Sequence, residues 1–260
     1  PYRNQQFYTL WMMVIVPRIA AVSYLNTIPF IYGIRHEGNF RADLSLSTPA
    51  DCVKSFIEGE ADIALLSSAV VPSLKGAEII TDYCIGASGA VRTVVVVGNT
   101  PIAKVRRIWL DSHSRTSVQL VGWLAANRWK IAPEWLLLDD YSLLDRPQEG
   151  DAYLLIGDKV FANEGRFAYS YDLAEEWKAQ THMPFAFAVW VGRKGLSYEI
   201  HDALQHALTF GIEHTYEAIV ESPYADRPYA YDYLTRNIDY VFNAEKHRAL
   251  EKFWNCGLKI

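Results

Sequence analysis

Ser23-Tyr24-Leu25-Asn26-Thr27-Ile28-Pro29-Phe30 follows directly after the apolar stretch Ile19-Ala20-Ala21-Val22. The apolar stretch predicts a buried strand, and the polar residues after it predict a turn that Pro29 closes. Such a turn places hydroxyl groups and the amide of Asn26 at the carboxyl end of a strand, where open α/β sheets bind small ligands. The segment therefore predicts an α/β fold with a ligand site at this strand end.

Strand and helix patterns alternate through most of the chain. Short apolar runs predict further buried strands at 61–66, 93–97, 107–110, 152–156 and 185–191. Helices are predicted from the candidate N-cap Thr48 to Gly59, over 114–130, from Asp172 and through most of the chain after Ser197. This alternation is typical of α/β folds.

The order of these elements predicts two lobes. We expect residues 14–94 and 189–260 to form the first lobe, residues 95–188 the second, and residues 1–13 an N-terminal extension. The crossing segments near 92–97 and 186–191 would then form a hinge, and residues at its strand ends would line a cleft between the lobes.

Composition argues against several classes of partner. The formal net charge is −5 and no Lys/Arg-rich run occurs, which argues against a nucleic-acid surface. No segment reaches the apolar length of a membrane span, and the apolar run from Phe7 to Val16 lacks a clear cleavage pattern. We therefore expect a cytoplasmic protein that binds neither membrane nor nucleic acid. No feature of the sequence predicts an oligomeric state.

The cysteines and histidines give no sign of a metal or a nucleophile. Cys52, Cys84 and Cys256 are odd in number and widely spaced, which argues against a disulfide framework or a zinc site and fits a reducing compartment. No cluster of His, Asp or Glu has metal-ligand spacing. The sequence has no G-x-S-x-G motif either, so we expect neither a metal site nor a serine nucleophile.

Two segments are candidate anion sites. Asp111-Ser112-His113-Ser114-Arg115-Thr116-Ser117 precedes a predicted helix, whose free N–H groups and dipole favour an anion. The alternative is plain capping by Ser112 or Ser114. In Ser88-Gly89-Ala90-Val91-Arg92-Thr93, Gly89 allows close backbone approach and Arg92 is suited to a carboxylate. The alternative there is a turn at Gly89 and a salt bridge from Arg92 to an acid.

Ser67-Ser68, after the predicted strand at 61–66, is a third candidate, with helix capping as its alternative. Two anion sites in one cleft would suit a dicarboxylate ligand.

Six segments, taken in order, resemble one enzyme family. They are Ser23-Tyr24-Leu25-Asn26-Thr27 with Pro29, Gly89 with Val91-Arg92-Thr93, Asp111 with Ser114-Arg115-Thr116-Ser117, Ile156-Gly157-Asp158, Tyr171-Asp172-Leu173 with Glu176-Trp177, and Pro184-Phe185 with Phe187-Ala188-Val189-Trp190. The set spans residues 18–192 and resembles the chorismate dehydratases of the futalosine route to menaquinone. The chain departs from the family pattern at Ala90, where proline is frequent, and at Thr93, where serine is frequent.

The resemblance implies a two-lobed fold like that of type 2 periplasmic binding proteins, with a ligand cleft between the lobes. It also implies a lyase that converts chorismate, a dicarboxylate, to 3-enolpyruvylbenzoate and water without a cofactor.

The implied catalytic residues are Asn26, which would bind the departing hydroxyl or hold the ring, and Ser88. Implied substrate-binding residues form three groups. Ser23, Thr27 and Ser67 are polar residues at strand ends. Arg92 and Thr93, together with Ser88 and beside Gly89, would hold one carboxylate. Ser114, Thr116 and Ser117, beside Arg115, would hold the other. Asp158 would orient a group in the cleft or cap a helix.

Two other functions fit the same pattern. The sister enzyme, 1,4-dihydroxy-6-naphthoate synthase, resembles the chain less closely at Ser23–Thr27 and Ser114–Ser117. A solute-binding protein would use the same lobes to capture a small carboxylate without chemistry, because a fold alone does not decide function.

Overall fold

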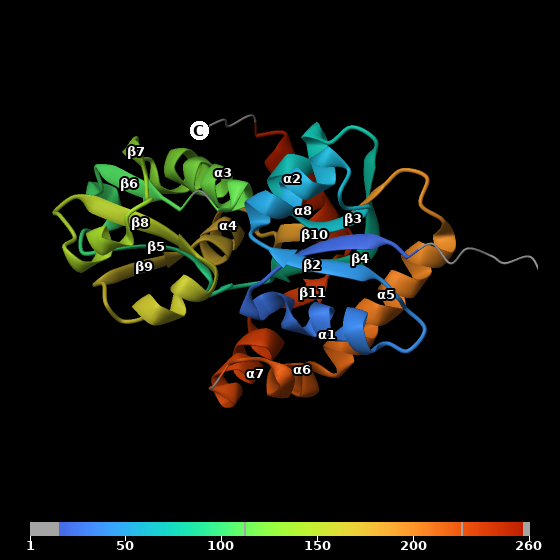
Figure 1. The fold of residues 1–260 in the computed structure, drawn as a ribbon. Helices are drawn as coiled ribbons and strands as arrows, with labels where there is room; N and C mark the ends of the chain where they lie inside the picture. The colour runs from blue at the N-terminus through green and yellow to red at the C-terminus, as the bar shows by residue number, and fades with distance from the viewer. Residues whose placement is uncertain (1–15, 112, 225, 257–260) are drawn as a thin grey trace, which may run out of the picture.

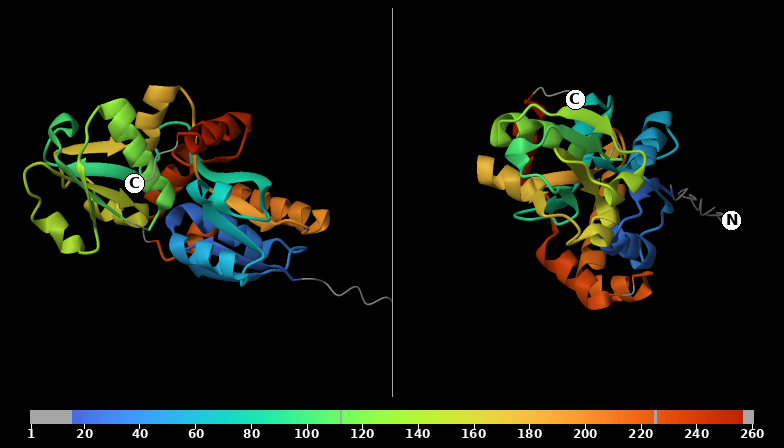
Figure 2. Two further views of the ribbon diagram at one scale, coloured as in Figure 1. Left: turned by 90° about the horizontal axis from the view of Figure 1, so that it is seen from above. Right: turned by 90° about the vertical axis from the view of Figure 1, so that its left-hand side faces the viewer.

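The computed structural model describes residues 16–111, 113–224 and 226–256, and arranges them around two β-sheets. Figure 1 shows the two sheets side by side, each with its own helices, and the view from above in Figure 2 shows the same separation. The predicted α/β class is confirmed. The predicted N-terminal extension, residues 1–13, lies outside the described residues.

The first sheet has six strands in the order β11-β4-β10-β3-β1-β2. Its strands are β1 (Arg18–Val22), β2 (Asp43–Ser47), β3 (Ile63–Ser67), β4 (Ala77–Ala87), β10 (Phe185–Arg193) and β11 (Asp239–Val241). β1 pairs in parallel with β2 and β3, whereas β10 pairs antiparallel with β3 and β4. The carboxyl ends of β1 and β3 therefore lie at one edge, which is the edge that carries Asn26 and Ser67.

Six helices belong to the first lobe: α1 (Ile28–His36), α2 (Pro49–Glu58), α5 (Tyr198–Glu213), α6 (Thr215–Glu221), α7 (Arg227–Arg236) and α8 (Ala244–Trp254). In Figure 1, α1 and α5 lie below the sheet and α2 and α8 above it. α1 and α5 cross closely because Gly33 and Gly211 lack side chains: a Cβ at either position would lie 1.9 Å from a backbone oxygen of the other helix.

The second sheet has five strands in the order β7-β6-β8-β5-β9. Its elements are β5 (Val94–Gly98), β6 (Arg107–Leu110), β7 (Glu134–Leu137), β8 (Asp151–Ile156) and β9 (Tyr169–Asp172), with α3 (Arg115–Leu124) and α4 (Leu173–Thr181). β6 runs parallel to β8, so Asp111 and Gly157 follow neighbouring strand ends. These ends face the strand ends of the first lobe.

The predicted lobe boundaries differ slightly from the sheets. β5 belongs wholly to the second sheet and β10 wholly to the first, so the chain crosses between Ala87 and Val94 and again between Thr181 and Phe185. The predicted boundary at residue 189 falls inside β10. We propose that the two crossings form the hinge.

Two local predictions need correction. Pro29 does not close the turn after β1. The turn is the short 3-10 helix η1 (Leu25–Thr27), and Pro29 lies in the first turn of α1, where its missing N–H costs nothing. The predicted helix over 114–130 ends as an α-helix at Leu124 and continues as a π-helical turn to Trp129.

The helix predicted from Thr48 to Gly59 is confirmed as α2. Thr48 Oγ1 accepts the N–H of Asp51 at 3.3 Å, and Gly59 ends the helix with a φ of 82°. Among the described residues, no helix is both long and apolar enough to span a membrane.

Candidate functional site

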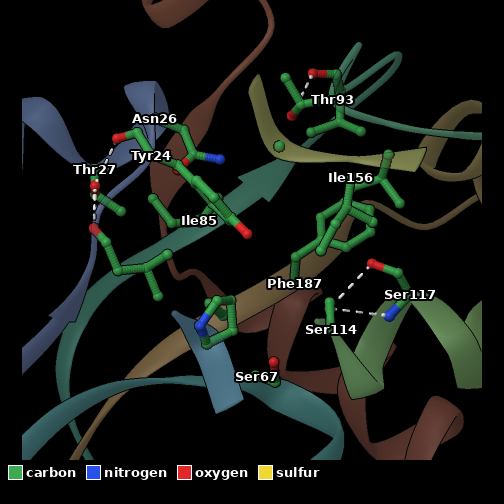
Figure 3. A pocket seen from close by; sticks show the side chains of 16 residues that line it. Tyr24, Asn26, Thr27, Ser67, Ile85, Thr93, Ser114, Ser117, Ile156 and Phe187 are labelled. Atoms are coloured by element: carbon green, nitrogen blue, oxygen red, sulfur yellow. Dashed lines mark hydrogen bonds between the residues drawn. The ribbon is translucent and has the colours of Figure 1, made fainter. Parts of the chain in front are cut away.

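A cleft with about 560 Å³ of empty space, part of it open solvent, lies between the strand ends of the two lobes (Figure 3). Both lobes and the first crossing segment line it. The lining residues are Val22, Tyr24, Asn26, Thr27, Pro49, Ser67, Ile85, Val91, Thr93, Val94, Ser114, Ser117, Ile156, Gly157, Phe187 and Ala188. The cleft is therefore largely apolar, with hydroxyl and amide groups at a few positions. No lining residue within the described ranges carries a formal charge.

Asn26 lies in the η1 turn with its side chain among the lining residues (Figure 3). The hydroxyl of Thr27 fixes this turn, since it donates to the carbonyl oxygens of Val22 at 2.6 Å and Tyr24 at 2.7 Å. The Tyr240 hydroxyl donates to the Asn26 carbonyl oxygen at 2.9 Å. Thr27 therefore lines the cleft while its hydroxyl donates to the backbone, and its contact with a ligand stays a prediction.

Thr93 connects Asn26 to the C-terminal helices. Its hydroxyl lies 2.8 Å from that of Tyr233, and the Asn26 side chain is a neighbour of the same phenol. Burial raises the pKa of Tyr233 despite its hydrogen bond to Thr93, so its phenol stays protonated at neutral pH. Thr93 and Tyr233 thus form a buried polar pair beside Asn26 at the cleft wall.

Ser67 ends β3 with 7% of its surface exposed, and its side chain does not cap the following 3-10 helix (Ser68–Ser73). Figure 3 shows the hydroxyl directed toward the cleft interior. The capping alternative is therefore wrong for Ser67.

Ser114 and Ser117 face Ser67 from the start of α3. Ser114 Oγ accepts the N–H of Ser117 at 3.3 Å and the hydroxyl of Ser117 at 3.1 Å, so Ser114 is the N-cap of α3. Both serines are buried and both line the cleft. The capping and ligand interpretations are thus compatible here, because the cap itself forms the cleft wall.

The neighbours of these serines lie elsewhere. Thr116 is fully buried, and its hydroxyl donates to the Phe187 carbonyl at 3.1 Å and accepts the Ala69 N–H at 3.1 Å. It joins α3 to the first lobe and is not among the lining residues. Arg115 is exposed and also does not line the cleft.

Arg92 does not face the cleft, contrary to the predicted carboxylate contact. Its guanidinium group donates to Glu164 at 2.8 Å and to the Tyr229 hydroxyl at 2.7 Å, and lies 4.7 Å above the Tyr229 ring. The backbone explains this direction: Arg92 has a φ of 65°, and its N–H donates to Asp172 at 2.6 Å. The salt-bridge alternative is the one that the structure supports.

Ser88 and Gly89 are also outside the cleft lining. Ser88 is exposed, and its hydroxyl donates to Asp239 at 2.6 Å, while the fully buried Lys246 binds the same carboxylate oxygen at 2.6 Å. Gly89 has open space where a side chain would extend. The catalytic contact predicted for Ser88 is therefore wrong in this geometry, because the side chain serves the β4–β11–α8 junction.

The last two predicted residues lie beside the cleft. Ser23 is exposed and borders a separate groove with Arg35 and Tyr224. Asp158 does not line the cleft, and its carboxylate accepts the N–H of Leu25 across the lobes.

Tyr24 is a lining residue that sequence reasoning missed. Its ring lies against Gly157, where a Cβ would come within 3.1 Å of the ring. Burial, and then the charges of Asp111 and Asp158, raise the pKa of Tyr24 to about 12, so its hydroxyl is a donor at neutral pH. Its position in the quoted Ser23–Phe30 segment was the available signal.

A charged cluster in the second lobe was missed as well. Asp111 is fully buried and pairs with His113 at 2.9 Å and with Lys159. Lys159 also donates to the Tyr141 hydroxyl at 2.5 Å. The cluster lies close in sequence to two lining residues, since His113 precedes Ser114 and Lys159 lies two positions after Gly157. Across the described ranges, no group of three or more His, Cys, Asp or Glu side chains is arranged to hold a metal ion.

Comparison with solved structures shows the fold. The chain matches a crystal structure of an Archaeoglobus fulgidus protein with a TM-score of 0.72 at 19% identity, covering 92% of this chain and 95% of that one. It also matches the periplasmic aliphatic sulphonate binding protein of Escherichia coli, with a TM-score of 0.61 at 13% identity and coverage of 92% and 90%. The fold is that of periplasmic binding proteins, as the family resemblance implied.

Comparison of sequences gives the family. A curated chorismate dehydratase of Thermus thermophilus is 28% identical over 195 residues, which are 66% of this chain and 68% of the relative. The family model described as menaquinone biosynthesis matches residues 17–258, nearly the whole chain. The protein therefore belongs to the menaquinone biosynthesis family.

Proposed function

We propose that the protein is a chorismate dehydratase, a carbon–oxygen lyase that converts chorismate to 3-enolpyruvylbenzoate and water. The observation that carries this proposal is the cleft itself: Asn26 and Ser67 from the first lobe face Ser114 and Ser117 from the second across mostly apolar walls. Family membership and the Thermus thermophilus relative support the choice of substrate.

The polar groups of the cleft suit a small dicarboxylate with a ring. Ser114 and Ser117 lie at the start of α3, where the helix dipole favours a carboxylate. Ser67 and the Asn26 amide provide hydrogen bonds from the opposite wall. The apolar residues Ile85, Ile156 and Phe187 offer contact to the ring and exclude water. We assign no carboxylate contact to Arg92.

The proposed reaction needs no oxidant. The ring carbon that bears the enolpyruvyl ether loses its proton, and the electrons of that C–H bond enter the ring. The neighbouring C–O bond breaks, and the hydroxyl departs with its electron pair and takes a proton to become water. Aromatisation supplies a large driving force, so the protein contributes mainly positioning.

Asn26 has the central role in this proposal. Its backbone is held by the η1 turn and by the Tyr240 hydroxyl, and its amide would hydrogen-bond the departing hydroxyl. No ionised base lines the cleft among the described residues. We therefore assign the proton to a carboxylate of the substrate itself, held within about 3 Å of the ring hydrogen.

The test is to mix the purified protein with chorismate and follow the products by ultraviolet absorbance and mass spectrometry. An aromatic product lighter than chorismate by one water is the expected result. Binding of chorismate without product, measured by tryptophan fluorescence, would indicate a solute-binding protein. The absence of both binding and product would overturn the proposal. The cyclised futalosine derivative used by the sister synthase would then be tried.

A further inference from the structure

Asp158 occupies a junction between the two lobes. It follows β8 in the 3-10 turn η6 (Gly157–Lys159), which begins at Gly157 with a φ of 64°. This left-handed conformation favours glycine and turns the chain toward the first lobe. Asp158 is half-buried and does not line the cleft.

The carboxylate of Asp158 binds two separate segments of the first lobe. The N–H of Leu25 lies 3.1 Å from Oδ1 and 3.2 Å from Oδ2, although the two residues are 133 positions apart. The Tyr224 hydroxyl, from the connection between α6 and α7, donates to Oδ2. One side chain of the second lobe thus joins the η1 turn to the C-terminal helices.

The hydrogen bond between Asp158 and Leu25 affects Asn26 because Leu25 and Asn26 are joined by one peptide bond. Leu25 is the first residue of η1, so its N–H has no partner within that short helix. Asn26 follows it directly. The other support of Asn26 is the Tyr240 hydroxyl, which donates to its carbonyl oxygen and belongs to the first lobe. The hydrogen bond with Asp158 is therefore the one that this turn receives from the second lobe, and it forms only when the lobes are together.

We propose that Asp158 is a positioning residue: by accepting the Leu25 N–H when the lobes are together, it sets the η1 turn and with it the amide of Asn26. This proposal rests on the proposed function, because Asn26 is the group that it positions. It assigns Asp158 no contact with substrate. Opening of the lobes would release the Leu25 N–H and leave the turn held from one side alone.

The first test does not depend on activity. We expect the Leu25 amide of the wild-type protein, measured by residue-resolved hydrogen–deuterium exchange, to exchange at least about tenfold more slowly than in Asp158→Ala. Asp158→Asn keeps a carbonyl oxygen that accepts the Leu25 N–H, so it should retain most of the protection. Asp145→Ala, an exposed carboxylate of the same lobe, is the matched control and should change nothing at Leu25.

The second test measures turnover of chorismate. Asp158→Ala should lower kcat roughly ten- to a hundredfold, as expected for a small displacement of a catalytic group. Asp158→Asn should restore kcat to within a few-fold of wild type. If turnover required the negative charge of Asp158, the asparagine variant would not recover in this way. If Asp158→Ala does not fold, Asp158→Ser replaces it, because the serine hydroxyl is one bond too short to reach Leu25.

Two results would overturn the proposal: unchanged Leu25 exchange in a folded Asp158→Ala or Asp158→Ser variant, or faster exchange with unchanged kcat. Failure of the proposed function has a different outcome. The wild-type protein would then not convert chorismate, while the exchange experiment would still report on the contact between Asp158 and Leu25.

Discussion

The ring of Tyr24 in the first lobe lies directly against Gly157 in the second, at a distance at which a side chain on the glycine would crowd the ring. The two residues line the cleft from opposite lobes. Gly157 also has a left-handed backbone, with a φ of 64°. The glycine thus serves two purposes, since it permits the turn after β8 and lets Tyr24 approach the strand end.

Gly157→Ala is expected to lower the free energy of unfolding and to raise KM for chorismate. Left-handed backbone costs a non-glycine residue about 1–2 kcal/mol, and the new Cβ would lie 3.1 Å from the Tyr24 ring. Gly165→Ala is the matched control, because Gly165 has a φ of 73° and open space around it. Urea denaturation and steady-state kinetics of both variants separate backbone strain from the Tyr24 contact. Equal changes in KM for Gly157→Ala and Gly165→Ala would show that the contact between Gly157 and Tyr24 is unimportant for substrate binding.

Asn26→Ala is expected to lower kcat by about 10²–10³-fold, the usual effect of removing a hydrogen bond to the charge that develops in a transition state. The turn should survive, since the Thr27 hydroxyl and the Tyr240 hydroxyl hold its backbone. Circular dichroism and denaturation would check the fold. Thr27→Val is the comparison that weakens the turn and leaves the amide in place. Full activity in Asn26→Ala would remove this residue from the mechanism.

Substitutions at Arg92 and Ser114 should differ in their effect on KM for chorismate. Arg92→Ala should leave KM within about twofold of wild type and cost at most about 1 kcal/mol of stability, because a partly exposed ion pair contributes little. Ser114→Ala should raise KM and cost about 1 kcal/mol through loss of the N-cap.

Ser114→Asp distinguishes the two contributions of Ser114. Aspartate keeps the cap, so stability should return, but its charge should repel a dicarboxylate and raise KM further. A large rise in KM for Arg92→Ala, with Ser114 variants unaffected, would contradict this assignment of the cleft.

The sequence predictions that the structure confirms rest on local residue patterns. A buried strand followed by polar residues located the ends of β1 and β3, and a serine before a helical pattern located the N-cap of α3. Each depends on residues within one turn or strand. The shared cleft then follows from the topology, because parallel strands end at the same edge.

The predictions that failed depend on contacts between distant residues. The Arg92 side chain points away from the cleft because it binds Glu164, which lies 72 positions further along the chain. Its backbone is also left-handed, which is uncommon outside glycine. Ser88 is bound by Asp239, 151 positions away. Neither partner has a local pattern that marks it in a single sequence. The residue types were suited to anion binding, but the direction of each side chain was set by tertiary structure.

The stability of the protein should show a pH dependence that comes from Asp158. Burial raises the pKa of this carboxyl group from 3.8 to about 6, and the Leu25 N–H opposes the rise only in part. The folded protein therefore holds this proton more tightly than the unfolded chain does. The corresponding stabilisation is fully present below about pH 4 and is lost as the pH rises through about 6.

Asp158→Asn removes this titration and provides the measurement. The free energy of unfolding of wild type minus that of Asp158→Asn, from urea denaturation at a series of pH values, should fall between about pH 4 and about pH 6.5 and be constant above it. Asp145→Asn, which changes an exposed carboxyl group, controls for net charge. A difference that rises with pH over this range would mean that hydrogen bonds from Leu25 and Tyr224 outweigh burial and favour the ionised carboxylate. The contact between the lobes would then be strongest at neutral pH and would weaken in acid.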